Sequence, residues 1–95
     1  VGVFNKDGKL TRIEEKPKNP KSDLGCMGVY MYSSKVFDCL KKIKKSRRGE
    51  YEISSVNSYM IKNHECSYGI IDDFCVDAGT MESYHYTNGL IYENE

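Results

Sequence analysis

The stretch VGVFNKDGKLTRI, residues 1–13, contains the clearest secondary-structure signal in this chain of 95 residues. Residues 1–4 form a short β-type run, and apolar and polar side chains alternate over residues 10–15, which is typical of a strand. The segment between them supplies turn residues, among which Asp7-Gly8 is a strong hairpin signal. The first thirteen residues therefore predict a β-hairpin.

Two segments of contrasting composition follow the hairpin. Residues 16–23 contain both prolines and three lysines, which predicts an irregular loop. Residues 25–32 (GCMGVYMY) are a continuous run of small, apolar and tyrosine residues. Such a run is typical of a central strand that is buried on both faces.

Apolar spacing predicts three helices. Ser33 and Ser34 are expected to cap the first, whose apolar face is formed by residues 36, 37, 40 and 43. The lysines on its other face are most simply a solvated surface. A second helix is predicted from Ile53 to about Asn63, and a third follows Thr80 as its N-cap.

Further strands are predicted at residues 66–71 and 74–76. The order of elements is then β-β-β-α-α-β-β-α, which indicates an α/β fold with a mixed sheet flanked by helices. A chain of 95 residues suits a single small domain.

Composition argues against several classes of function. The 14 Lys and Arg residues balance 14 Asp and Glu, which argues against a nucleic-acid binder that relies on bulk positive charge. The longest nearly apolar stretch, residues 26–32, is too short to cross a membrane. The four cysteines show no CxxC spacing and lie in apolar segments, so we expect reduced core cysteines and a cytoplasmic protein.

Four short segments place charged groups or a glycine in predicted loops or strands. They are Glu14-Glu15-Lys16-Pro17, Gly28-Val29-Tyr30, residues 48–53 (RGEYEI) and Asp77-Ala78-Gly79-Thr80. Each has an ordinary structural explanation in isolation: a solvated turn, close packing at a glycine, a helix start and a capping turn.

Taken in order, these segments resemble the sugar nucleotidyltransferases, and among them the thymidylyltransferases that act on glucose 1-phosphate. Gly2-Val3 and Asp7-Gly8 match the family's first strand and turn, and residues 13–17 match its Ile-Glu-Glu-Lys-Pro segment. The Gly-x-Tyr strand, the Arg-Gly-Glu-x-Glu-Ile segment and the Asp-x-Gly-Thr turn follow in the family's order. The resemblance covers nearly the whole chain, from Gly2 to about Leu90.

The resemblance implies both a fold and a reaction. The fold would be the C-terminal portion of a Rossmann-like nucleotide-diphospho-sugar transferase, with residues 1–95 as its sugar-phosphate-binding part. The family's Gly-rich triphosphate-binding segment has no counterpart here, so we expect the N-terminal nucleotide-binding half to be absent and the chain alone to be inactive. The family reaction joins a sugar 1-phosphate, here glucose 1-phosphate, to a nucleoside triphosphate, here dTTP, and releases pyrophosphate.

The resemblance assigns the phosphate and metal contacts to three side chains. Lys16 and Arg48 would be the catalytic residues that hold the sugar phosphate, for which a compact ammonium and a planar guanidinium are both suited. Asp77 would bind Mg²⁺, which typically takes one or two carboxylates plus substrate phosphates.

The remaining substrate-binding residues would contact the sugar. The Glu15 carboxylate would accept hydrogen bonds from sugar hydroxyls, and Gly2 and Cys26 would supply backbone contacts. Gly28 and Tyr30 would complete the pocket.

Two alternatives to this enzyme remain open. One is a free-standing, non-catalytic module that binds sugar phosphates or oligomerises, and the other is an unrelated α/β protein. The chain departs from the family pattern at Ser54-Ser55, Cys75 and Ala78. We also expect a homo-oligomer, because the strand edges of residues 25–32 would be exposed.

Overall fold

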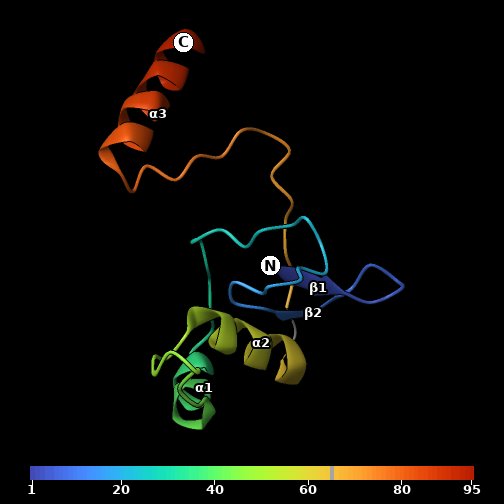
Figure 1. The fold of residues 1–95 in the computed structure, drawn as a ribbon. Coiled ribbons are helices and arrows are strands. Elements are labelled where there is room, and N and C mark those ends of the chain that lie inside the picture. Colours follow the sequence, from blue (N-terminus) through green and yellow to red (C-terminus); the bar gives the residue numbers. More distant parts are fainter. Residues whose placement is uncertain (65) are drawn as a thin grey trace.

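The computed structural model describes residues 1–64 and 66–95 and is a small mixed α/β structure. A two-stranded sheet and three helices are its regular elements (Figure 1). In chain order they are β1 (Gly2–Phe4), β2 (Leu10–Ile13), α1 (Val36–Lys42), α2 (Ile53–Asn63) and α3 (Met81–Glu93).

The predicted hairpin is confirmed. Strands β1 and β2 pair antiparallel, with Gly2 opposite Ile13 and Phe4 opposite Leu10. The Asn5 side chain organises the turn, because its Oδ1 accepts hydrogen bonds from the backbone nitrogens of residues 7 and 9 at 3.0 and 2.9 Å. Gly8 has a φ of +76°, a left-handed conformation that glycine adopts without steric cost.

One residue of β2 has no opposite partner in the hairpin. The register shifts between Val3 and Phe4, which leaves Thr11 as the extra residue of a bulge. The Thr11 hydroxyl donates to the Val3 carbonyl at 2.8 Å, so the side chain supplies a hydrogen bond across the irregularity.

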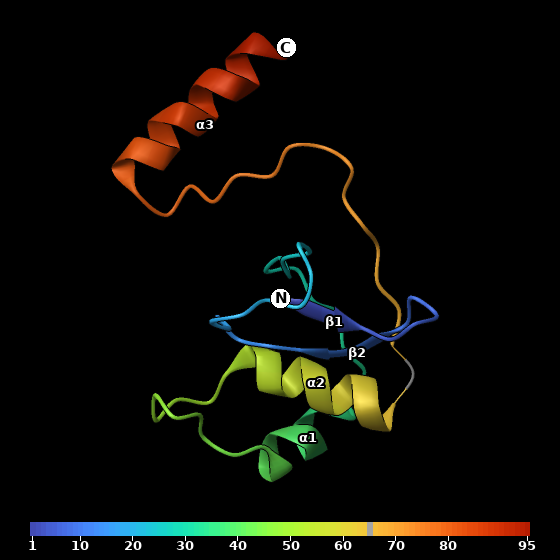
Figure 2. The same cartoon turned by 45° about the vertical axis from the view of Figure 1, so that its right-hand side comes forward.

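The core lies between α1 and α2, and α2 also packs against β2. Figure 2 shows α2 between the hairpin and α1. Cys39 from α1 and Val56 and Met60 from α2 are the buried hydrophobic side chains of this cluster. Val56 and Met60 are four residues apart, which places them on the same helical face as the 3.6-residue period requires.

The third helix is capped locally and stands apart. Thr80 and Ser83 form a capping box at its start, as the predicted N-cap requires. No contact joins α3 to another helix or strand among the described residues, and an extended segment leads to it (Figure 1). The radius of gyration is accordingly 15.8 Å, against about 12 Å for a compact chain of this length.

The strands predicted at residues 25–32, 66–71 and 74–76 are wrong, since these segments are not in strand conformation. A strand needs a neighbour to pair its backbone groups, and the described residues form only the two-stranded sheet. Their apolar side chains are consequently exposed: Val29 is 83% and Met31 97% accessible.

Two smaller expectations also need correction. Lys35 is the N-cap of α1 and no side chain caps this helix; Ser33 and Ser34 contribute only their backbone carbonyls. All four cysteines are free, as predicted, but Cys39 alone is buried, because the other three lie in the extended segments. Among the described residues, no helix is both long enough and apolar enough to cross a membrane.

Candidate functional site

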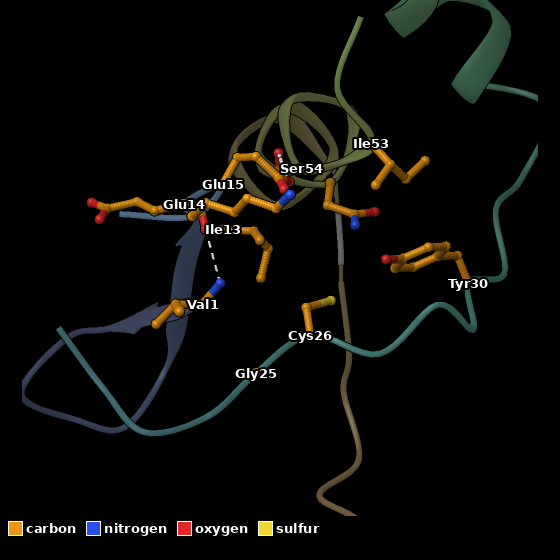
Figure 3. A pocket seen from close by; sticks show the side chains of 11 residues that line it. Val1, Ile13, Glu14, Glu15, Gly25, Cys26, Tyr30, Ile53 and Ser54 are labelled. Carbon is orange, nitrogen blue, oxygen red and sulfur yellow. Dashed lines mark hydrogen bonds between the residues drawn. The ribbon is translucent and has the colours of Figure 1, made fainter. Parts of the chain in front are cut away.

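A pocket of about 240 Å³ opens where the end of β2 meets the first turns of α2. Residues from the segment after the hairpin and from the 25–30 segment close its other sides. Figure 3 shows the Cys26 sulfur and the Tyr30 ring turned toward the space beside Glu15 and Ser54. The lining residues are Val1, Ile13, Glu14, Glu15, Lys16, Gly25, Cys26, Tyr30, Ile53, Ser54 and Asn57.

The Glu15 carboxylate is held by a serine of α2. The Ser54 hydroxyl donates to Glu15 Oε2 at 2.9 Å, and Ser54 itself is buried. A carboxylate has two acceptor oxygens, and Ser54 occupies only Oε2, so Oε1 retains its full capacity to accept hydrogen bonds. The arrangement therefore orients the carboxylate at the pocket and leaves one of its oxygens available to a ligand.

A second serine of α2 holds the backbone of β2. The Ile13 nitrogen donates to Ser58 Oγ at 2.9 Å, and the Ser58 hydroxyl donates to the Ile13 carbonyl at 2.8 Å. Ser54, Asn57 and Ser58 are spaced i, i+3 and i+4, so they occupy one face of α2. This polar face meets the end of β2, where the predicted substrate residues begin.

Replacement of Ser58 by Ala is expected to lower the free energy of unfolding by about 1–2 kcal/mol, because both backbone groups of Ile13 lose their partner. Urea unfolding measures this loss, and amide hydrogen exchange at Ile13 localises it. Ser55→Ala is the matched control on the same helix. Equal stabilities for the two variants would contradict the role given to Ser58.

Lys16 has an unusual backbone conformation. Its φ is +38°, and no other non-glycine residue of the described chain has a positive φ. Such a conformation costs about 1–3 kcal/mol and is found preferentially at functional sites. Lys16 lines the pocket next to Glu15, so one carboxylate and one ammonium come from consecutive residues.

Tyr30 lines the pocket, and Tyr32 lies behind it. The Tyr30 and Tyr32 rings are stacked, with centroids 6.1 Å apart and an interplanar angle of 21°. Burial, together with the neighbouring Cys26, raises the pKa of Tyr30, and burial also raises the pKa of Tyr32. Both phenols therefore stay protonated at neutral pH, and the Tyr32 hydroxyl donates to Asn57 Oδ1.

Gly2 lies beside the pocket, not in its lining. Its nitrogen donates to the Leu24 carbonyl at 3.0 Å, and its carbonyl accepts a hydrogen bond from the Ser22 hydroxyl. The N–H and carbonyl groups of Gly2, which was predicted to contact the sugar through its backbone, therefore both form hydrogen bonds within the chain.

The structure does not bring Arg48 into the pocket. The guanidinium lies 3.4 Å from a Glu50 oxygen and 3.5 Å from a Glu52 oxygen. It belongs to the loop before α2, where Gly49 has a φ of +77°. Gly28 and Asp77 are also outside the lining residues, and both are exposed.

The candidate metal ligand is a single carboxylate. Among the described residues, no three His, Cys, Asp or Glu side chains gather closely enough to hold a metal ion. Asp77 sits on the extended segment before α3, where the described residues provide no ready-made cage for a metal ion. One carboxylate suits Mg²⁺ only when substrate phosphates and water supply the remaining ligands.

Four of the predicted residues are thus assembled, namely Glu15, Lys16, Cys26 and Tyr30. The sequence reasoning missed the residues that support them, Ser54, Asn57 and Ser58. Their i, i+3, i+4 spacing was the available signal, because a polar residue on the packed side of a helix needs a hydrogen-bond partner.

Comparisons with known proteins agree with the resemblance. The family profile described as nucleotidyl transferase matches residues 1–94. The chain is 40% identical over 85 residues to a glucose-1-phosphate thymidylyltransferase of Mycolicibacterium smegmatis, an alignment that covers 87% of this chain and 30% of that enzyme. A glucose-1-phosphate thymidylyltransferase of Neisseria meningitidis is 39% identical over 87 residues, covering 90% of this chain and 30% of its own length.

A more distant relative carries a different name. The bifunctional protein GlmU of Methanocaldococcus jannaschii is 32% identical over 79 residues, covering 83% of this chain and 19% of its own. No solved structure was found to match. The chain spans about 30% of the length of the thymidylyltransferases that it matches. Because the family profile extends over nearly all of its residues, the chain belongs to the nucleotidyl transferase family.

Proposed function

We propose that this chain forms the sugar-phosphate-binding part of an enzyme that transfers a nucleotidyl group to a sugar 1-phosphate. The proposed sugar phosphate is glucose 1-phosphate and the proposed nucleotide is dTTP, as the names of the two similar thymidylyltransferases suggest. The observation that carries the proposal is the pocket in which an oriented carboxylate and an ammonium come from adjacent residues, Glu15 and Lys16.

The two side chains suit the two ends of such a substrate. The free Oε1 of Glu15 accepts a hydrogen bond from a sugar hydroxyl, since Oε2 is already bound to Ser54. The Lys16 ammonium has three donors and no acceptor, so it pairs with phosphate oxygens. The sequence places this charge on the residue directly after the carboxylate, and the backbone of Lys16 is strained at this position, with a φ of +38°.

The reaction needs positioning and charge neutralisation more than covalent help. A phosphate oxygen of the sugar 1-phosphate attacks the α-phosphorus of the triphosphate in line. A new P–O bond forms, the bond to the β-phosphate oxygen breaks, and its electron pair leaves with pyrophosphate. Lys16 holds the attacking phosphate and offsets its charge during the approach of two anions.

Arg48 is proposed as a second phosphate contact. Its pair with Glu50 is exposed, with side chains 52% and 61% accessible, and such pairs contribute little stability. Phosphate therefore competes readily with Glu50 for the guanidinium, whereas the Glu52 side chain is 12% accessible and is the stronger competitor. Binding in this mode requires Arg48 to leave Glu50 and Glu52.

Mg²⁺ is proposed as the cofactor, with Asp77 as its ligand from this chain. The ion would neutralise phosphate charge, and substrate phosphates and water would supply the other ligands. Asp77 is exposed on the extended segment before α3, so its carboxylate is available for this contact.

The binding step is tested by isothermal titration calorimetry with glucose 1-phosphate, inorganic phosphate and glucose as separate ligands. We expect glucose 1-phosphate to bind about tenfold more tightly than phosphate, because Glu15 contributes a charge-assisted hydrogen bond to the sugar. Glu15→Gln should reduce this preference without weakening phosphate binding, because it removes a negative charge from the pocket. Equal affinities of the unmodified chain for glucose 1-phosphate and phosphate would overturn the proposal.

A further inference from the structure

We propose that Asn57 recognises a second sugar hydroxyl. Its Nδ2 donates a hydrogen bond to the hydroxyl adjacent to the one that donates to Glu15. This inference rests on the proposed function and adds a specificity-determining residue to its site. Asn57 lines the pocket from the second turn of α2. It lies three residues after Ser54, the residue that holds Glu15, so both polar groups come from one helical face.

The orientation of the Asn57 amide is set by Tyr32. The protonated phenol needs an acceptor, and its hydroxyl donates to Asn57 Oδ1. An amide has its acceptor at one end and its two donors at the other, so engagement of Oδ1 leaves the Nδ2 end for a ligand. No protein group accepts a hydrogen bond from this nitrogen in the described residues.

Tyr32 is itself held in place. Its ring stacks on Tyr30, which lines the pocket, and it packs against the buried cluster of α1 and α2. The amide is therefore fixed by a side chain that is partly buried and packed on two sides. A fixed donor loses little conformational freedom on binding, which favours specific recognition.

The pocket then offers a matched pair of polar groups. Glu15 Oε1 accepts, Asn57 Nδ2 donates, and a sugar hydroxyl can do either. Two adjacent hydroxyls of a pyranose satisfy both groups at once, whereas a sugar phosphate that lacks one of them leaves a protein group unpaired. Rejection of such an analogue is stronger than the gain from the correct contact alone, because the unpaired group has lost its water.

The test is Asn57→Asp, measured as the ratio of the dissociation constants for inorganic phosphate and glucose 1-phosphate. The substitution keeps an acceptor for Tyr32 and replaces the donor by an oxygen. Its negative charge repels both ligands, and the ratio removes this common effect. We expect the ratio to fall about threefold, as for the loss of one neutral hydrogen bond. The matched control is Asn63→Asp, which places the same charge on the same helix about 9 Å further along; its ratio should equal that of the unmodified chain.

Deoxy analogues of glucose 1-phosphate identify the hydroxyl. The analogue that lacks the partner of Asn57 should bind less tightly to the unmodified chain, and its affinity relative to inorganic phosphate should fall no further with Asn57→Asp. Tyr32→Phe, which releases the amide, should lower the ratio by about twofold. A merely structural role of Tyr32 would lower the stability of the chain and leave the ratio unchanged.

The outcomes separate the two proposals. If the unmodified chain shows no preference for glucose 1-phosphate over phosphate, the proposed function fails. If it shows the preference and Asn57→Asp leaves the ratio unchanged, the proposed function stands and the role of Asn57 is overturned.

Discussion

Replacement of Lys16 by Ala is expected to weaken glucose 1-phosphate binding by about 100-fold. A hydrogen bond between an ammonium and a phosphate is worth roughly 1.5–3 kcal/mol, which corresponds to about 10–150-fold in affinity. The upper part of this range is appropriate because Lys16 has the one cationic side chain among the lining residues of the pocket. Calorimetric titration with glucose 1-phosphate measures the change directly.

The unusual backbone of Lys16 requires two further variants. Lys16→Gly also removes the charge but suits a φ of +38°, so it separates the loss of the ammonium from a change in backbone strain. We expect it to bind as weakly as Lys16→Ala. Lys18→Ala removes a neighbouring lysine of the same loop and should stay within about twofold of the unmodified chain. Normal affinity in Lys16→Ala would show that phosphate is bound elsewhere.

Replacement of Met60 by Ala is expected to lower the free energy of unfolding by about 2–5 kcal/mol, because it removes a buried side chain and leaves a cavity. The cluster between α1 and α2 has three buried hydrophobic residues, Cys39, Val56 and Met60, so little apolar contact remains to compensate. Small domains have a total stability of about 5–15 kcal/mol. A substantial loss of folded chain at 37 °C is therefore expected, and urea unfolding followed by circular dichroism measures it.

Met31→Ala provides the control for this substitution. Met31 is 97% accessible, so the same truncation there should change the free energy of unfolding by less than about 0.5 kcal/mol. Similar losses in the two variants would mean that the packing between α1 and α2 does not stabilise the chain.

Elements whose signals are local were predictable from the sequence. The hairpin depends on Asn5, Gly8 and the alternation of β2, all within thirteen residues. The start of α3 depends on Thr80 and a serine three residues later. In both cases the residues that form the hydrogen bonds are close in the sequence, so the local sequence is enough to predict the interaction.

Elements that depend on a distant partner were not predictable. The run at residues 25–32 has the composition of a buried strand, but composition does not provide a neighbouring strand to pair with. Val29 and Met31 consequently remain exposed. The first helix likewise begins at Val36 without the expected serine cap, because its contacts with α2 stabilise it instead.

The candidate site was predictable in part for the same reason. Glu15 and Lys16 are adjacent, so the chain itself brings their charges together at the pocket. Arg48 faces Glu50 and Glu52, which are its own near neighbours and equally good partners. The Ser54 hydroxyl reaches Glu15 across 39 residues, and the Ser58 hydroxyl reaches Ile13 of β2 across 45. The local spacing of these serines can indicate a packed polar face of α2, but it does not specify the partners.

The serine that binds Ile13 has a consequence for association between molecules. The outer backbone groups of Ile13 are bound to Ser58, and those of Gly2 are bound to Leu24 and Ser22. Both margins of the hairpin are thus blocked at the end nearest the pocket. An incoming strand from a second molecule finds no free donor and acceptor pair there, so the ligand-binding end of the sheet is protected from edge-to-edge aggregation.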